Sequence, residues 1–189
     1  MNDELPAALA AEGGLVLRPW RATDVTRLHE ACQDEEIQRW TTVPVPYTRE
    51  SAVAFVGIAD AGWKQRSSAL FCVTDANGDL LGATGLVELD LAQATGEVGY
   101  WTAQWARGRG VAASSTRALA RWAFDELGLL RIVWAAELGN ERSRRVALGV
   151  GFGFEGVAPD RLPMRDGSRT DAWVGTLLPR DLIRLKENP

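Results

Sequence analysis

The sequence has few of the side chains that bind metals or form nucleophilic triads. Among 189 residues there are one histidine, His29, and two cysteines, Cys32 and Cys72. The cysteines have neither metal-ligand spacing nor a disulfide framework, so we expect two reduced thiols and no metal site. No G-x-S-x-G motif is present, which disfavours a serine hydrolase built on His29.

Long apolar runs and an excess of positive charge are also lacking. No segment reaches the roughly 18 uninterrupted apolar residues that suggest a membrane-spanning helix. Residues 1–14 lack the basic start and apolar core of a signal peptide. The formal net charge is −4, which argues against general nucleic-acid binding. We therefore expect a cytoplasmic protein that binds neither membranes nor nucleic acid directly.

Length and pattern indicate a single globular domain. A chain of 189 residues suits one sizeable core, and no internal repeat or linker divides it. We expect an N-terminal extension at 1–14, one domain at 15–180 and a C-terminal tail at 181–189.

Hydrophobic periodicity and turn residues predict a mixed α/β order. Seven strands are expected, at Leu15–Trp20, Ala69–Thr74, Leu80–Leu89, Gly96–Thr102, Leu130–Glu137, Phe152–Val157 and Asp171–Leu178. A first helix is expected from Thr23 or Asp24 to Asp34, with 35–40 as an extension. Further helices are expected from Thr48 to Gln65, from the end of the segment at Ala113 to Leu127, and from Asn140 to Leu148. Val43–Tyr47 holds two prolines and is predicted to be a loop.

A glycine-rich turn, R-G-R-G-V-A-A at Arg107–Ala113, comes before a predicted helix. The first N–H groups of a helix have no intrahelical partner and carry partial positive charge, so this turn predicts an anion site. One interpretation is a loose G-x-G-x-x-A dinucleotide fingerprint. It is disfavoured because Ala103–Arg107 is not a buried strand and because Asp125 lies in the following helix rather than after a second strand. The other interpretation is the [QR]-x-x-G-x-[GA] pyrophosphate loop of the GNAT acetyltransferases.

Flanking motifs favour the second interpretation. Upstream, E-V-G-Y-W begins at Glu97; downstream lie N-E-R-S at Asn140 and G-F-G-F-E-G at Gly151. In this order and spacing, over about 15–180, the sequence resembles the GNAT superfamily, and specifically its ribosomal-protein N-terminal acetyltransferase branch. Some members of that branch have a glutamate after the E-G pair, proposed as a base. Here the corresponding stretch, P-D-R-L from Pro159, has none.

The resemblance implies a mostly antiparallel sheet flanked by helices and splayed between its fourth and fifth strands, with acetyl-CoA as co-substrate. The backbone of Tyr100, Trp101 and Thr102 would pair with the pantetheine arm. Asn140 would hydrogen-bond to that arm, although a plain helix N-cap is an alternative role. The pyrophosphate would be held by Arg107, Gly108, Arg109, Gly110, Val111, Ala112 and Ala113.

Catalysis by direct attack needs a base, an oxyanion donor and a proton for the leaving thiolate. By the resemblance, Ser143 lies near the cofactor sulfur as proton donor; the alternative is a solvated helix residue. Glu97 is the candidate base, with Glu88 or water as alternatives and a structural carboxylate as the non-catalytic interpretation. Trp40 and Tyr47 are expected to border the acceptor amine, unless Trp40 merely closes the core.

Three functions stay open at this stage. The leading one is acetylation of a protein or peptide α-amine. The others are acetylation of a small amine, such as an antibiotic or amino-acid derivative, and non-catalytic binding of acyl-CoA. A homodimer would follow only by analogy with the branch.

Overall fold

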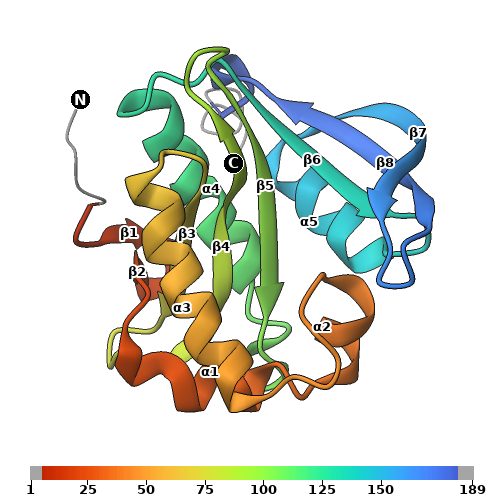
Figure 1. Cartoon of the computed structure of the whole chain (residues 1–189). Helices are drawn as coiled ribbons and strands as arrows, with labels where there is room; N and C mark the ends of the chain where they lie inside the picture. The colour runs from red at the N-terminus through yellow and green to blue at the C-terminus, as the bar shows by residue number, and fades with distance from the viewer. Residues whose placement is uncertain (1–5, 183–189) are drawn as a thin grey trace.

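The computed structural model describes residues 6–182, whose centre is one eight-stranded sheet (Figure 1). The spatial order of the strands is β1-β2-β3-β4-β5-β6-β8-β7. Their bounds are β1 Leu9–Ala11, β2 Leu15–Pro19, β3 Ala69–Thr74, β4 Leu80–Asp90, β5 Thr95–Thr102, β6 Arg131–Glu137, β7 Gly153–Pro163 and β8 Arg169–Leu177. Within the described residues, β5 and β6 run parallel and the other neighbouring strands run antiparallel. The predicted mixed α/β fold with a mostly antiparallel sheet is confirmed.

Helices cover both faces of this sheet. They are α1 Val25–Ala31, α2 Glu35–Trp40, α3 Arg49–Lys64, α4 Val111–Asp125 and α5 Glu141–Val150, with 3-10 turns at Ala22–Asp24 and Gln104–Ala106. Helices α1 and α3 lie on the near face in Figure 1, and α4 and α5 lie behind the sheet and contact each other. We call these the α3 face and the α4 face. None of the described helices is long and apolar enough to cross a bilayer.

Two cores follow from the alternation of side chains along the strands. On the α4 face, Phe71 and Leu119 are fully buried, and the Trp122 ring meets Phe71 edge-on at 5.4 Å between centroids. On the α3 face, Leu28 and Cys72 are fully buried. Both cysteine thiols are buried and free, and burial raises the pKa of each to about 12.

The predicted helix through Asp34 and onward to Trp40 is divided into two. Asp34 has an extended backbone, with ψ at 125°, and its carboxylate accepts a hydrogen bond from the Ile37 N–H at 3.0 Å. An aspartate in this conformation is an N-cap, so α2 begins as a separate short helix. It therefore leaves the direction of α1 and lies beside the opening between β5 and β6 (Figure 1).

Residues outside the expected limits of 15–180 also pack on the domain. Leu9–Ala11 form β1 on the edge of β2, and Glu12 pairs with Arg117 of α4 at 3.0 Å. At the other end Leu182 is buried in the α4-face core. Residues 1–5 of the expected extension and 183–189 of the expected tail lie outside the described residues.

Candidate active site

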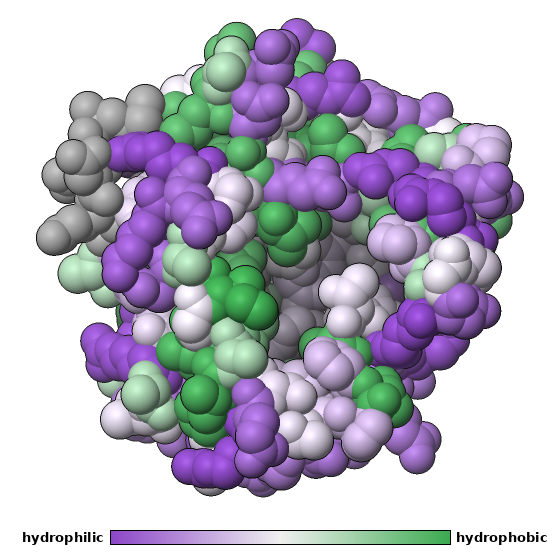
Figure 2. All heavy atoms as spheres, in the orientation of Figure 1, coloured by the Kyte–Doolittle hydropathy of each residue, from purple (hydrophilic) through white to green (hydrophobic). Residues whose placement is uncertain are grey.

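Strands β5 and β6 separate halfway along β5. They pair only from Thr95 with Arg131 to Val98 with Trp134. Gly99–Thr102 continue to pair with β4 on one side, but no described strand covers their β6 side. The expected splay is thus present, and it leaves open a length of backbone that can form ladder hydrogen bonds. Figure 2 shows a hollow in the middle of this face of the molecule.

The glycine turn opens α4 at the wide end of this gap. Gly108 and Gly110 have φ of 76° and 72°, in the left-handed region that favours glycine. Gly110 is the N-cap residue, and no side chain caps the helix. Gly108, Arg109 and Gly110 are exposed. The first N–H groups of this fifteen-residue helix therefore have no capping side chain, and an exposed turn leads into them, as an anion site requires.

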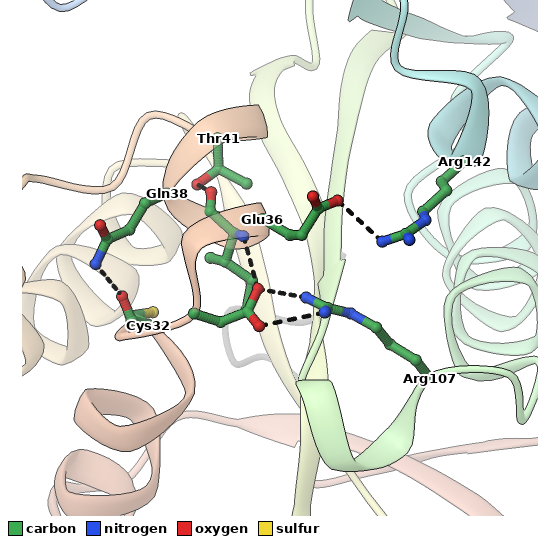
Figure 3. Close-up of polar contacts among 8 residues, drawn as sticks. Cys32, Glu36, Gln38, Thr41, Arg107 and Arg142 are labelled. Atoms are coloured by element: carbon green, nitrogen blue, oxygen red, sulfur yellow. Dashed lines mark hydrogen bonds and ion pairs between the residues drawn. The ribbon is translucent and has the colours of Figure 1, made fainter.

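Arg107, expected at the pyrophosphate, is paired within the protein. Its two terminal nitrogens contact the Asp34 carboxylate at 2.5 and 3.2 Å, so the turn before α4 is bound to the N-cap of α2 (Figure 3). Burial alone would raise the pKa of Asp34. The hydrogen bonds from Arg107 and the Ile37 N–H outweigh it, and the pKa lies below its ordinary value. Asp34 is thus a charged acceptor that joins two parts of the site.

Asn140 and Ser143 occupy the first turn of α5. The Asn140 side-chain oxygen accepts from the Ser143 N–H at 3.1 Å, which is the N-cap role considered as its alternative. The Asn140 Nδ2 makes no hydrogen bond to the described residues and is free to bind a ligand. The Ser143 Oγ lies 3.0 Å from the Trp134 Nε1 and 3.1 Å from the Tyr100 Oη. Ser143 is therefore held in the gap rather than solvated.

Glu97 lies on the opposite face of β5 from Tyr100, and its side chain is only 14% exposed. Its Oε2 pairs with Arg161 of β7, whereas Oε1 has no partner among the described residues. Burial raises the pKa of Glu97. Arg161 opposes this shift, and Glu88, the cross-strand neighbour of Glu97 on β4, adds to it. A carboxylate with a raised pKa and one open oxygen is suited to accept a proton near neutral pH.

Helix α2 spans the opening and is tied to both sides of it. Besides Asp34–Arg107, Glu36 meets Arg142 of α5 at 2.9 Å (Figure 3), and Arg39 meets Glu137 of β6 at 2.6 Å. Arg165, in the turn between β7 and β8, donates to the backbone oxygens of Thr41 and Val43, each at 2.9 Å. These contacts place α2 as one wall of the hollow.

The two residues expected beside the acceptor differ in their surroundings. Trp40 is half-buried and lines a cavity of about 260 Å³ together with Glu36, Gly139 and Arg142. Its ring lies 4.1 Å below the Arg39 guanidinium. Tyr47 is 4% exposed and packs in the α3-face core, so its side chain offers an acceptor little surface. Between the two, only Trp40 faces a space that an acceptor could enter.

Four residues of the site were missed by sequence reasoning. Asp34, Trp134 and Arg161 were not assigned to it, and Tyr100 was expected to contribute only its backbone. Asp34 had a detectable signal, because an aspartate followed by two acidic residues is typical of a helix start. The contacts of Trp134, Tyr100 and Arg161 join residues between 9 and 64 positions apart, and no local pattern encodes such pairs.

Comparison with known proteins agrees with this geometry. Residues 14–153 match the family model described as an acetyltransferase (GNAT) domain. A Bacillus subtilis (strain 168) protein named as a ribosomal N-acetyltransferase, YdaF, is 38% identical over 105 residues. That match covers 56% of this chain and 57% of the relative, less than two thirds of its length.

Solved structures share the fold over nearly the whole chain. Mycobacterium smegmatis RimJ, in complex with CoA-disulfide, has a TM-score of 0.81 at 22% identity and covers 93% of this chain and 87% of its own. RimL, described as a ribosomal L7/L12 alpha-N-protein acetyltransferase in complex with coenzyme A, has a TM-score of 0.81 at 19% identity, covering 90% and 97%. The family model matches well over half of this chain, so the chain belongs to the GNAT acetyltransferase family.

Proposed function

We propose that this protein moves the acetyl group of acetyl-CoA to the α-amine of a protein or peptide N-terminus, by direct attack in a ternary complex. The observation that carries the proposal is the gap between β5 and β6, which has Ser143 held inside it and an uncapped helix start at its wide end. The likeness to RimJ and RimL and the name of the Bacillus subtilis relative support this class of acceptor.

The cofactor fits the gap by three kinds of contact. The pyrophosphate is assigned to the exposed turn at Gly108–Gly110, where backbone N–H groups and the α4 dipole favour negative charge. The pantetheine amides are assigned to the open edge of Gly99–Thr102, because an extended chain can add to a strand there. Asn140 Nδ2 is a further donor to the arm.

The reaction then needs a group that accepts the proton lost by the amine and a group that supplies a proton to the leaving thiolate. The neutral amine attacks the thioester carbonyl carbon, and a backbone N–H of the open β5 edge donates to the carbonyl oxygen as it becomes negative. Glu97, directly or through a water, accepts the proton that the amine loses. When the carbon–sulfur bond breaks, the Ser143 hydroxyl donates its proton to the thiolate and regains one from solvent, to which Glu97 releases the proton it took from the amine. No covalent enzyme intermediate is required.

A free-thiol release assay with acetyl-CoA tests the proposal across peptides, polyamines and aminoglycosides. We expect release with peptides that carry a free α-amine and blocked lysines, and none with the same peptides acetylated at the N-terminus. A preference for polyamines or aminoglycosides would overturn the acceptor assignment. Tight CoA binding without turnover on any amine would instead indicate an acyl-CoA-binding module.

A further inference from the structure

The Ser143 hydroxyl lies between two hydrogen-bonding side chains. The Trp134 Nε1 donates to its Oγ at 3.0 Å. The Tyr100 Oη lies 3.1 Å from the same Oγ and 3.0 Å from the Ser143 carbonyl oxygen. Ser143 N–H is in turn fixed by Asn140 at 3.1 Å. Both the backbone and the hydroxyl of Ser143 are therefore set in position before any substrate arrives.

The register of the sheet explains why these groups meet. Trp134 is the last residue of β6 that pairs with β5, opposite Val98, and Tyr100 follows two positions later on β5. Side chains two residues apart on a strand share a face, and both rings belong to the α4-face core against which α5 packs. Tyr100 and Trp134 thus bracket Ser143 at the point where the strands part.

The number of protons limits what this cluster can do. An indole N–H can only donate, so Ser143 Oγ must accept from Trp134. The Tyr100 hydroxyl has one proton and can give it to Ser143 Oγ or to the Ser143 carbonyl oxygen. When Tyr100 donates to Oγ, the serine proton has no partner in the cluster and is free for a third group. Burial raises the pKa of the Tyr100 phenol, so it stays protonated and remains a donor.

We propose that Tyr100 and Trp134 are positioning residues for acetyl transfer, whose two donors hold Ser143 Oγ as a double acceptor and direct its proton toward the departing thiolate. The inference rests on the proposed function, in which Ser143 serves the leaving group. As the carbon–sulfur bond breaks, the thiolate takes up the serine proton or shares it, and negative charge grows on Oγ. Two donors aimed at Oγ stabilise that charge.

Tyr100→Phe removes one donor and keeps the ring. A hydrogen bond to an oxygen with developing charge should be worth about a 10- to 100-fold change in the single-turnover rate. The Kd for acetyl-CoA should stay within about twofold of wild type, because the lost contact acts in the transition state. With the selenoester analogue of acetyl-CoA, whose selenolate leaves without needing a proton, the effect of Tyr100→Phe should shrink. A purely structural role for Tyr100 would not make the effect depend on the leaving group.

Trp134→Phe removes the other donor but also core volume, so it needs a matched control. Trp122→Phe loses similar volume in the same α4-face core, where its ring packs on Phe71 and Trp63 away from Ser143. We expect comparable falls in melting temperature for the two variants and a slower chemical step only for Trp134→Phe. Equal rates in the two variants would assign the effect of Trp134 to packing and overturn its positioning role.

A double-mutant cycle separates failure of the inference from failure of the proposed function. In a Ser143→Ala background, Tyr100→Phe should change the rate by less than about twofold, since both act through one hydroxyl. A slow Ser143→Ala enzyme beside a Tyr100→Phe enzyme of wild-type rate would overturn the positioning role alone. Wild-type chemistry in Ser143→Ala would instead remove Ser143 from the proposed mechanism, and the inference with it.

Discussion

Substitution of Gly110 separates the stability of the turn from its ability to bind an anion. Gly110 has φ 72°, and a Cβ built on it meets no atom within 4 Å. The substitution should therefore destabilise the folded state only by the cost of holding a non-glycine residue in the left-handed conformation, about 1–2 kcal/mol for alanine. For a chain of this size that corresponds to a fall in melting temperature of about 2–8 °C. The new methyl group would project into the open space beside the first N–H groups of α4, where a pyrophosphate is expected.

Gly128, just after the other end of α4, is the matched control. Its φ is 69°, and its Cβ would also meet nothing within 4 Å. Gly128→Ala should cost the same stability as Gly110→Ala and leave the binding of CoA unchanged. We expect calorimetric titration with CoA to show binding weakened at least about tenfold in Gly110→Ala and lost in Gly110→Val. If Gly110→Val bound CoA as tightly as Gly128→Ala, the pyrophosphate would not lie at this turn.

Two further predictions concern helix α2. Asp34→Asn keeps an N-cap side chain but loses the charge that pairs with Arg107, whereas Asp34→Ala loses both. The free energy of unfolding should therefore fall by about 1 kcal/mol more in Asp34→Ala than in Asp34→Asn, because only the alanine variant loses the cap. The pKa of Asp34 is lowered in the folded protein, so the charged pair stabilises the fold at pH values above the ordinary aspartate pKa. In thermal melts, the stability advantage of the wild type over Asp34→Asn should therefore vanish as the pH falls through the lowered pKa. Trp40→Ala should raise the acceptor KM without changing the Kd for CoA. Its loss of stability should stay below the roughly 3–5 kcal/mol of a fully buried tryptophan, and a loss of that full size with unchanged acceptor kinetics would make Trp40 a core residue.

The sequence predicted the parts of the fold that depend on local pattern. Strands such as Ala69–Thr74 and the helix start at Asn140 follow from periodicity and from capping residues. The glycines at 108 and 110 predicted a tight turn before a helix, and the structure gives both a positive φ, at which other residues are strained. These features are determined within a few residues of chain, so reasoning from the sequence could find them.

The side-chain contacts of the site depend instead on tertiary packing. Arg107 sits in the expected loop, yet its guanidinium binds Asp34, 73 residues earlier. Arg161 meets Glu97 across 64 residues because the β7–β8 hairpin folds back along the sheet beside β6. Neither pairing has a local signature, since an arginine can reach any carboxylate that the fold brings near. Sequence reasoning could therefore propose which residues form the site but not how their charges are paired.

The alternation of side chains along β5 separates the two proton transfers of the proposed reaction. Glu97 points to the α3 face with Arg161 and Glu88, and Tyr100 points to the α4 face with Ser143. A thioester in the gap between β5 and β6 would thus meet its base from one side and the proton donor for its leaving group from the other. Because the side-chain period of a strand is two, the odd spacing between Glu97 and Tyr100 suffices to produce this arrangement.

This separation predicts that substitutions of Glu97 and of Ser143 change the pH dependence of kcat/KM in different ways. A base works only when deprotonated, so activity should fall as the pH drops through the pKa of Glu97, which burial raises above the ordinary 4.5. Glu97→Gln should abolish this acidic limb. Ser143→Ala should lower the plateau and leave the limb in place, since none of the groups that set the pKa of Glu97 touches Ser143. A limb that shifted in Ser143→Ala would mean that the two groups share one proton network, and a limb that persisted in Glu97→Gln would assign the base to Glu88 or to water.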